Sequence, residues 1–580
     1  MKLRGRSLVR GVASAELHYC PVGLSFWGGV NPNTGQIMDH HHPLCGQSVA
    51  KRVLAIPRGR GSCTGSTVML ELLLNGCAPA ALVFEQPEQI LTLGVIVGQL
   101  LFGETIPVAM LSSSDFSQLC NSSYATVEDD IVHVSDALLP LPELSSESTE
   151  TSIELSDMDR DILAGRHGQA AQVALEIIRQ YAVVQGAQRL LDVSQAHIDA
   201  CIYTGPASLR FAQKFQAMGA SFILPTTLNS ISIDQRRWKE LGIDSTLASQ
   251  AGTLANIYLA MGAQSSFTCA PYTLDSAPKL GEDIGWSESN AVIFANSVLG
   301  ARTEKNPDFI DVCIALTGRA PLAGCHLPAG RRPTVCIQVG DLPPVNDSIY
   351  PLLGYVVGEL AENHIPLVCG LEYLQPQLMD LKAFSAAFGT TASAAMFHLK
   401  GITAEAARFA GLEREIPDVQ LDREALIESW RALNSAQDPS VDLVSLGNPH
   451  FSREEFDALT RLCRGRKKGS QVQFVVTTGR NTYESADTAG WIDVLKEFGA
   501  TIITDTCWCM LGEPVIPPTA RNIMTNSAKY AHYAPGMVKR GVHFGSLNEC
   551  VEAGCTGQFT GAPPGSSNVQ LQQSPCRYRK

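Results

Sequence analysis

The sequence predicts an α/β protein in which a small N-terminal domain precedes a large one. The chain has 580 residues, which is too long for a single hydrophobic core. Strand-like and helix-like segments alternate from residue 158 onward, and the Ser-, Thr- and Glu-rich stretch before them lacks an apolar face, as linkers do. We expect a small domain at 1–140, a linker at 141–157, a large domain at 158–560 and a disordered tail at 561–580.

The small domain is expected to combine strands with helices. Residues 80–84 and 106–111 are apolar enough to form buried strands, and 131–134 form a shorter one. Residues 66–75 have helical spacing of apolar side chains and end at an Asn-Gly pair, which is typical of a helix C-terminus. The apolar run 90–102 is too short to cross a bilayer, so we interpret it as a buried helix or a strand and turn.

The large domain is expected to begin with helices and to continue as repeated strand–helix units. A helix start is predicted at 156–159, and helical spacing continues over 168–181. Short apolar segments bounded by turns follow, separated by helical stretches such as 208–218. The predicted strands include 200–203, 221–224, 334–339, 472–477 and 502–504. This alternation favours largely parallel sheets covered by helices.

Composition argues against two kinds of partner. The formal net charge of -13 leaves no basic stripe to neutralise phosphates, so we expect no nucleic-acid partner. No apolar run is long enough for a membrane span, so we expect no membrane partner. The 17 cysteines follow no regular framework and no secretory signal precedes them. We therefore expect reduced thiols and a cytoplasmic location.

A basic, glycine-rich segment precedes the predicted helix of the small domain. It reads Arg58-Gly59-Arg60-Gly61-Ser62, and its glycines allow backbone amides to face a ligand near a helix N-terminus. Arg58 and Arg60 can bind a carboxylate with two parallel hydrogen bonds, and positive neighbours stabilise a serine that loses its proton. Taken alone, however, the segment favours a helix cap with surface arginines. The His-rich segment 39–43 is interpreted as a loop near the domain cleft, because successive histidines point in different directions and rarely bind one ion.

Two segments of the large domain carry further candidates. Cys507 and Cys509 follow a predicted strand, and Cys269 lies in an unusually polar stretch. Iron–sulfur clusters take thiolate ligands from distant segments, but no CxxC pair is present, and a buried inert thiol is the commoner role of a cysteine. Residues 525–533 concentrate hydrogen-bonding groups on a predicted loop, which suggests a cradle for an anion or substrate; a capped surface loop is the alternative.

Taken together, these segments resemble the aconitase X family over about 1–135 and 158–560. Several long motifs occur in the family's order, which makes the resemblance specific. The motifs of the small domain are residues 26–35, 39–43 and 58–66. Those of the large domain are residues 268–272, 286–291, 296–303 and 525–533.

The resemblance implies an activity and a fold. The family includes two-subunit archaeal enzymes that dehydrate mevalonate 5-phosphate and fused enzymes that dehydrate cis-3-hydroxy-L-proline. This chain is similar to the fused type, with a small swivelling β/α domain followed by a large multi-layer α/β aconitase-like domain. The resemblance therefore implies a hydro-lyase that converts a small hydroxy amino acid, cis-3-hydroxy-L-proline, to Δ1-pyrroline-2-carboxylate and carries an iron–sulfur cluster.

The resemblance also implies roles for particular residues. Ser62 matches the family's proposed proton acceptor, and Cys269 and Cys507 match cysteine ligands of the cluster. Asn448 stands where the archaeal pattern has a third cysteine, so a three-cysteine cubane is not expected. We favour a [2Fe-2S] cluster. Besides Cys269 and Cys507, the candidates for its remaining protein ligand are Cys509, Cys369 and Asn448, which occupies the position of the archaeal third cysteine.

These inferences combine into one mechanistic hypothesis. Exposed iron acts as a Lewis acid on the 3-hydroxyl group, and Ser62 removes the proton from C2. Arg58, Arg60 or Lys529 holds the substrate carboxylate, and Asn526 and Ser527 complete the binding site. The alternatives are dehydration of mevalonate 5-phosphate and a non-catalytic iron- or ligand-binding protein of the same fold.

Overall fold

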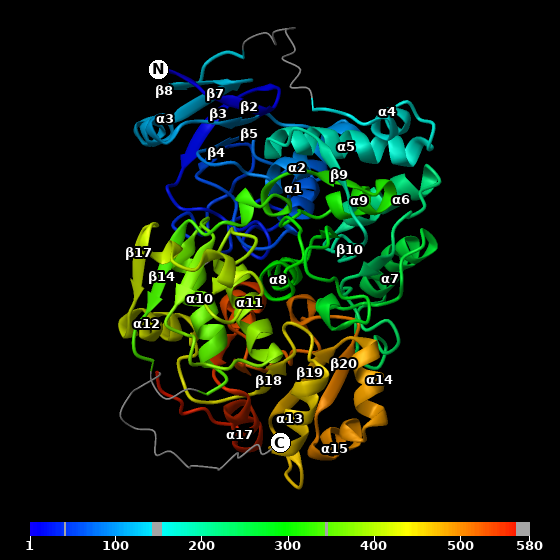
Figure 1. Cartoon of the computed structure of the whole chain (residues 1–580), viewed down its shortest axis with the longest axis vertical. Coiled ribbons are helices and arrows are strands. Elements are labelled where there is room, and N and C mark those ends of the chain that lie inside the picture. The colour runs from blue at the N-terminus through cyan, green and yellow to red at the C-terminus, as the bar shows by residue number, and fades with distance from the viewer. Residues whose placement is uncertain (40–41, 142–152, 343–345, 564–580) are drawn as a thin grey trace.

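The computed structural model describes residues 1–39, 42–141, 153–342 and 346–563, and Figure 1 shows how its elements are arranged. The N-terminal elements, drawn in blue, lie at one end of the molecule beside the cyan helices that follow residue 156, and the later elements build the rest. Most of the predicted linker and most of the predicted tail lie outside the described residues.

One sheet of eight strands organises the small domain. Its strand order is β1-β8-β7-β3-β4-β5-β6-β2, with parallel pairing from β3 to β6. β1 and β2 lie at opposite edges although only Gly5 separates them, so the sheet curls back on itself. A side chain at Gly5 would collide with the backbone of Met110 on β6. The strands are β1 (Lys2–Arg4), β2 (Arg6–Val9), β3 (Val12–Tyr19), β4 (Val53–Ile56), β5 (Ala81–Phe84), β6 (Val108–Met110), β7 (Tyr124–Glu128) and β8 (Ile131–Ser135).

Three helices accompany this sheet, and the local predictions for this domain are confirmed. They are α1 (Gly65–Leu74), α2 (Ile90–Val97), which a π-helical turn extends over Gly98–Phe102, and α3 (Ser113–Gln118). The predicted strands correspond to β5, β6 and β8, and the apolar run 90–102 is helical. Buried apolar side chains of α1 and α2 join those of β4 and β5 in one core, which explains why both helices are apolar nearly all round.

The first part of the large domain surrounds a short parallel sheet of order β11-β10-β12 and an antiparallel pair, β13-β9. The expected helix start is confirmed, because Ser156 caps α4 in a capping box with Asp159. The elements are α4 (Asp157–Leu163), α5 (Gln169–Gln185), β9 (Leu190–Asp192), β10 (Ala196–Ile198), α6 (Pro206–Ala217), β11 (Thr226–Leu228), α7 (Ser245–Ala260), β12 (Gly285–Trp286), α8 (Ser289–Phe294), α9 (Ile310–Thr317) and β13 (Arg319–Pro321).

Two strand predictions in this part are wrong. Residues 200–203 form a turn after β10, because the backbone amides of Asp199 and Ala200 both donate to the carboxylate of Asp311 instead of to a neighbouring strand. Residues 221–224 precede β11 and have no regular secondary structure. The amide of Phe222 donates to the carbonyl of Met261, which directly follows α7. Apolar side chains in each segment mimic a strand pattern, and only tertiary partners reveal the difference.

Two further parts complete the large domain. Each is a parallel sheet, of order β16-β15-β14-β17 in one and β20-β19-β18-β21-β22 in the other, with helices between consecutive strands. The predicted strands at 334–339, 472–477 and 502–504 are confirmed as β14, β19 and β20. The second part contains β14 (Val335–Val339), α10 (Ile349–Ala361), β15 (Pro366–Cys369), α11 (Leu378–Thr391), β16 (His398–Leu399), β17 (Asp418–Leu421) and α12 (Arg423–Leu433). The third contains β18 (Leu443–Leu446), α13 (Arg453–Cys463), β19 (Gln473–Thr478), α14 (Arg480–Thr488), α15 (Trp491–Phe498), β20 (Thr501–Thr504), β21 (Asn522–Thr525), α16 (Ala528–Val538), β22 (Gly541–Phe544) and α17 (Leu547–Thr556).

The small domain docks on the large one through its helices. α1 contacts α6, and α2 contacts α5, so the segment that leads into α1 faces the large domain. Within the described ranges, no helix combines the length and the apolar character needed to cross a bilayer.

Candidate active site

The Ser62 turn, residues 58–66, connects β4 to α1 at the surface where the two domains meet. Ser62 is 8% exposed, and its Oγ lies 3.1 Å from Oγ1 of Thr64. Gly61 adopts a φ of 81°, and a Cβ there would lie 2.7 Å from Ser25 Oγ and 2.9 Å from the hydroxyl of Tyr533. Tyr533 belongs to α16 of the large domain, so both domains enclose the turn, and only glycine fits at position 61.

Parallel strands explain why distant residues of the third part converge. Asn448 follows β18, Cys507 and Cys509 follow β20, and Lys529 lies in the first turn of the helix after β21. Because the carboxyl ends of parallel strands meet at one edge of a sheet, side chains placed directly after these strands come together. Cys269 reaches the same place from the first part, and the three cysteines form one buried cluster. Trp27 of the small domain packs against this cysteine cluster.

Two of the cysteines, Cys269 and Cys509, accept hydrogen bonds that would stabilise negative charge on sulfur. The amide of His450 donates to Sγ of Cys269 over 3.2 Å, and Nδ2 of Asn448 donates to Sγ of Cys509 over 3.1 Å. Cys507 and Cys509 are hydrogen-bonded to each other; this bond lowers the pKa of Cys509 and raises that of Cys507. Burial raises the pKa of Cys269 well above its usual value.

The donor set determines which inorganic group suits this place. Among the described residues, no group of three or more His, Cys, Asp or Glu side chains is arranged to hold a metal ion. Three neighbouring sulfurs, two of them supplied with N–H donors, are nevertheless the ligand type that iron–sulfur groups use, so the residues fit such a group by chemistry. Cys369 lies in a different cluster, with its Sγ 3.8 Å from Sγ of Cys336.

A buried ion pair lies beside the cysteine cluster. Nζ of Lys529 is 3.1 Å from Oε1 of Glu288, and Asn229 and Asn290 also donate to that carboxylate. Burial lowers the pKa of Lys529, but Glu288 and then the three cysteines raise it by more, so it stays well above its usual value. The site therefore holds a permanent cation next to three potential thiolates.

The predicted substrate-binding residues occupy three different environments. Arg60 donates to Asp39 over 2.8 Å, and Asp39 lines a hollow of about 20 Å³ with Ser25 and Tyr533. Arg58 points elsewhere, donating to Gln86 over 2.7 Å and lying 3.8 Å from Glu362. The structure thus places Arg60, but not Arg58, beside the interdomain hollow.

The segment 525–533 is not the predicted loop. Thr525 ends β21, and Ser527 caps α16 by accepting a hydrogen bond from the amide of Tyr530. The Ser527 hydroxyl also donates to the carbonyl of Asn448, 2.5 Å away, which ties the cap to the cysteine site. Asn526 and Ser527 line a second small hollow next to Asn448. The bunching of polar residues in this segment therefore builds a helix N-terminus.

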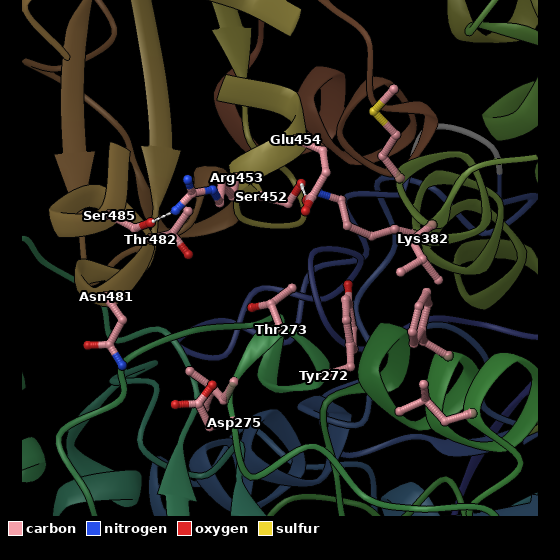
Figure 2. A pocket seen from close by; sticks show the side chains of 15 residues that line it. Tyr272, Thr273, Asp275, Lys382, Ser452, Arg453, Glu454, Asn481, Thr482 and Ser485 are labelled. Carbon is pink, nitrogen blue, oxygen red and sulfur yellow. Dashed lines mark hydrogen bonds between the residues drawn. The ribbon is translucent and has the colours of Figure 1, made fainter. Parts of the chain in front are cut away.

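A much larger cavity lies elsewhere. Figure 2 shows this space of about 530 Å³, with Tyr272 on one side and Arg453 and Ser485, which are hydrogen-bonded to each other, on the other. Neither Ser62 nor any member of the cysteine cluster lines it. Lys382 in its wall donates to the carbonyl of His450, whose amide donates to Cys269, so His450 connects the cavity wall to the cysteine cluster.

Three buried residues of this region escaped the reasoning from sequence. Glu288 pairs with Lys529, Lys305 donates to the carbonyl of Ala392 over 3.1 Å, and Asp308 contacts the Ser62 turn. Burial lowers the pKa of Lys305. Glu288 falls inside the motif 286–291, which offered a signal, whereas charged residues such as Lys305 and Asp308 are ordinarily exposed and nothing local marks them as buried.

Comparisons with known proteins agree with this architecture. Family models described as the aconitase X swivel, first, second and third domains match residues 2–135, 152–329, 333–431 and 441–556. Two proteins named cis-3-hydroxy-L-proline dehydratase, from Hypocrea jecorina and Pseudomonas aeruginosa, are each 52% identical, over 97% and 96% of this chain and 96% and 97% of theirs. A crystal structure of Thermococcus kodakaraensis aconitase X in its holo-form is 29% identical, covers 69% of this chain and all of its own, and has a TM-score of 0.62.

These matches place the chain among enzymes of the hydro-lyase class. The chain belongs to the aconitase X family. The expected fold, a small swivelling domain and a large multi-layer α/β domain, is confirmed.

Proposed function

We propose that the protein dehydrates cis-3-hydroxy-L-proline to Δ1-pyrroline-2-carboxylate. The observation that carries the proposal is identity of 52% over nearly the whole chain to two proteins with that substrate in their name. The geometry is compatible with it, because the Ser62 turn and the cysteine cluster both lie where the small domain meets the large one. The thiols of such a site stay reduced in the cytoplasm, which we propose as its location.

The reaction needs a base that removes the proton at C2. Ser62 is our candidate, with its Oγ as the proton acceptor. A serine hydroxyl is a weak base, so it has to lose its own proton as it takes the substrate's; the departing 3-hydroxyl group, which leaves as water, is the acceptor of that proton. Lys305 lies within electrostatic reach of the adjacent Cys63 and supplies positive charge that would stabilise the serine oxyanion.

Negative charge that develops at C2 spreads into the substrate carboxylate. We assign this carboxylate to Arg60, which pairs with Asp39 at the interdomain hollow, and to Lys529, which lies beside the cysteines. An iron–sulfur group, which we propose to be [2Fe-2S] and to be held by Cys269, Cys507 and Cys509 with Asn448 beside it, would supply a Lewis acid for the departing 3-hydroxyl. The enamine left after loss of water tautomerises to the imine product.

The substrate requires an opening motion. The interdomain hollow measures about 20 Å³, which is room for roughly one water molecule. We infer that the small domain moves away to admit the substrate and returns to enclose it, which would exclude water from the reacting atoms.

The test is an assay of purified, iron-loaded protein with separate substrates. We expect turnover of cis-3-hydroxy-L-proline and none of mevalonate 5-phosphate. Ser62→Ala should lower kcat by about 10²- to 10⁴-fold while leaving the iron content and visible absorbance unchanged. Ser112→Ala, which removes a cap from α3 at the surface of the same domain, is the matched control and should keep full activity.

Other outcomes separate the alternatives. Turnover of the phosphorylated hydroxy acid alone would replace our substrate assignment. Binding of hydroxyproline without turnover by the iron-loaded protein would favour a non-catalytic binding protein. Normal activity of Ser62→Ala would remove Ser62 from the mechanism while leaving the substrate assignment intact.

A further inference from the structure

Asp308 anchors the Ser62 turn to the large domain. Its backbone amide donates to the carbonyl of Cys63 over 3.3 Å, and its own carbonyl accepts from the hydroxyl of Ser66 over 3.2 Å. Its carboxyl oxygen Oδ2 accepts from the hydroxyl of Thr67 over 3.0 Å. All three bonds cross the domain boundary, and all three residues follow Ser62 within five positions. The position of the proposed base therefore depends on Asp308 of the large domain as well as on the small domain's own backbone bonds.

A second buried aspartate faces Asp308. Asp199 lies directly after β10, and both side chains are completely buried. Asn229 donates to Oδ1 of Asp199, and Thr67 donates to Oδ2 of Asp308. The other oxygen of each carboxyl, Oδ2 of Asp199 and Oδ1 of Asp308, has no donor among the described residues. The two carboxyl groups are close enough to hydrogen-bond to each other.

A single proton shared between the two carboxyl groups would give both unpaired oxygens a hydrogen-bond partner. Two carboxylates cannot both stay ionised at such close range, and buried polar atoms are normally hydrogen-bonded. If one carboxyl keeps its proton, it donates to the other, and each orphaned oxygen gains a partner. The pair then acts as a neutral donor and a carboxylate joined by a short bond, as in other pairs of adjacent carboxyl groups.

The charged surroundings favour the same protonation state. Burial raises the pKa of Asp199 well above its usual value, with Asp308 as the next cause, and burial, followed by Asp311, raises the pKa of Asp308 to about 8. A pKa that is higher in the folded than in the unfolded state means that rising pH removes stability until it passes the folded value. The titratable groups that face the pair from neighbouring elements are Asp311, Glu288, Cys63, Cys201 and Tyr258. The cation Lys305 acts on Cys63 of the turn.

We propose that Asp199 and Asp308 form a proton-sharing carboxyl pair that positions the Ser62 turn for catalysis. Both are positioning residues, since they act through the turn and not on the substrate. This inference rests on the proposed role of Ser62 for its effect on turnover. Its structural half, the anchoring of the turn, stands without that role and can be measured separately.

The test compares two substitutions of Asp308 in the full-length, iron-loaded protein. Asp308→Asn has the shape of a protonated aspartate, can donate to Asp199 and can still accept from Thr67, so we expect it to keep most of the turnover at pH 7. Asp308→Ala removes the side-chain bond to Thr67 and the shared proton but keeps the two backbone bonds, so we expect kcat to fall by about 100-fold while KM and iron content change little. Hydrogen–deuterium exchange should become faster in the peptide that covers 62–67 for Asp308→Ala and stay slow for Asp308→Asn.

Two further measurements distinguish positioning from general stability. Wild-type kcat should decline as the pair loses its proton at alkaline pH, whereas kcat of Asp308→Asn should stay level there. Asp159→Asn is the matched control, because Asp159 is also buried but is ionised in a bidentate pair with Arg319, at 2.8 and 3.1 Å, far from the site. It should lower Tm without moving the pH profile or the exchange of the turn.

Specific results would overturn the proposal. If Asp308→Asn loses as much turnover as Asp308→Ala while it remains folded, the negative charge is what matters and no shared proton is involved. If Asp308→Ala exchanges no faster over 62–67, the Asp308 side chain does not hold the turn, and the proposal fails. If Asp308→Ala fails to fold, Thr67→Val replaces it, since it removes one crossing bond and should also speed exchange of the turn. Should the protein not dehydrate hydroxyproline at all, the exchange measurements still decide the anchoring.

Discussion

The Ser62 turn comes from one continuous stretch of chain, whereas the cysteine cluster comes from segments nearly 240 residues apart in the sequence. The turn is built from glycines and hydroxyl groups, and Asp308 fixes it from the other domain. The cluster is built from sulfurs whose donors, His450 and Asn448, sit in a turn after β18. Both are buried, but the first depends on a domain contact and the second on the packing of parallel strands. Changes to the cysteines should therefore abolish cofactor binding, and changes near Ser62 should disturb turnover alone.

The largest expected effect comes from the sulfurs. Cys269→Ser and Cys507→Ser should remove the iron and lower turnover by more than about 1,000-fold, because the departing hydroxyl then has no Lewis acid. Iron analysis of the purified variants is the measurement. Cys336→Ser, which alters a thiol next to Cys369 in a separate cluster, is the matched control and should retain iron. Iron at wild-type levels in Cys269→Ser would contradict this contrast between the two regions, since the cysteine cluster would then not bind the iron.

A smaller effect is expected from a residue that only donates a hydrogen bond to one of the sulfurs. Asn448→Ala removes a donor to Cys509, so iron affinity should fall by about 10- to 100-fold without being lost. Competition with a chelator measures this affinity. Asn481→Ala, which changes a residue in the cavity of Figure 2, serves as the control. Complete loss of iron in Asn448→Ala, with Cys509→Ser unaffected, would make Asn448 the ligand instead of Cys509.

Substitutions of Arg58 and Arg60 should reveal which arginine of the Ser62 turn binds the substrate. Arg60→Gln should raise KM by about 10-fold or more with a smaller change in kcat, because a charge-assisted bond to the carboxylate is lost. Arg58→Gln should change KM little, since Arg58 is directed at Gln86 and Glu362. Steady-state kinetics of the two variants provides the measurement. The opposite pattern would show that Arg58 reorients when the domains open.

The smallest effect concerns acid stability of the large domain. Burial lowers the pKa of His197 to about 3 and that of His398 to about 4. Both stay neutral in the fold but gain a proton in the unfolded chain below about pH 6.5, so their contribution is present above that value and is lost as pH falls toward 4. We expect the Tm of the wild-type protein to drop between pH 7 and pH 5, and the Tm of His398→Gln to drop less over the same range. An identical pH dependence in the variant would exclude His398 as a cause.

Much of the fold could be predicted because it is local. The capping box at Ser156, the Asn-Gly end of α1 and the apolar strands β5, β14 and β19 carry their signals within a few residues. The segment 525–533 shows the limit: its polar residues do reach the site, but as a helix N-terminus, because Ser527 finds a backbone amide three residues ahead. The strand prediction for residues 200–203 failed because the amides of Asp199 and Ala200 bond to Asp311, over 100 positions away.

The sequence by itself determined the α/β class, the two-domain order and the family, since motif spacing and apolar periodicity are properties of the chain alone. It also marked Ser62 and the cysteines as candidates. Tertiary structure alone decided that Arg60 and not Arg58 lies beside the interdomain hollow, that Cys369 belongs to another cluster, and that Asp199 meets Asp308. The physical reason is that burial and charge proximity, which set these roles, arise only when segments distant in sequence pack against one another.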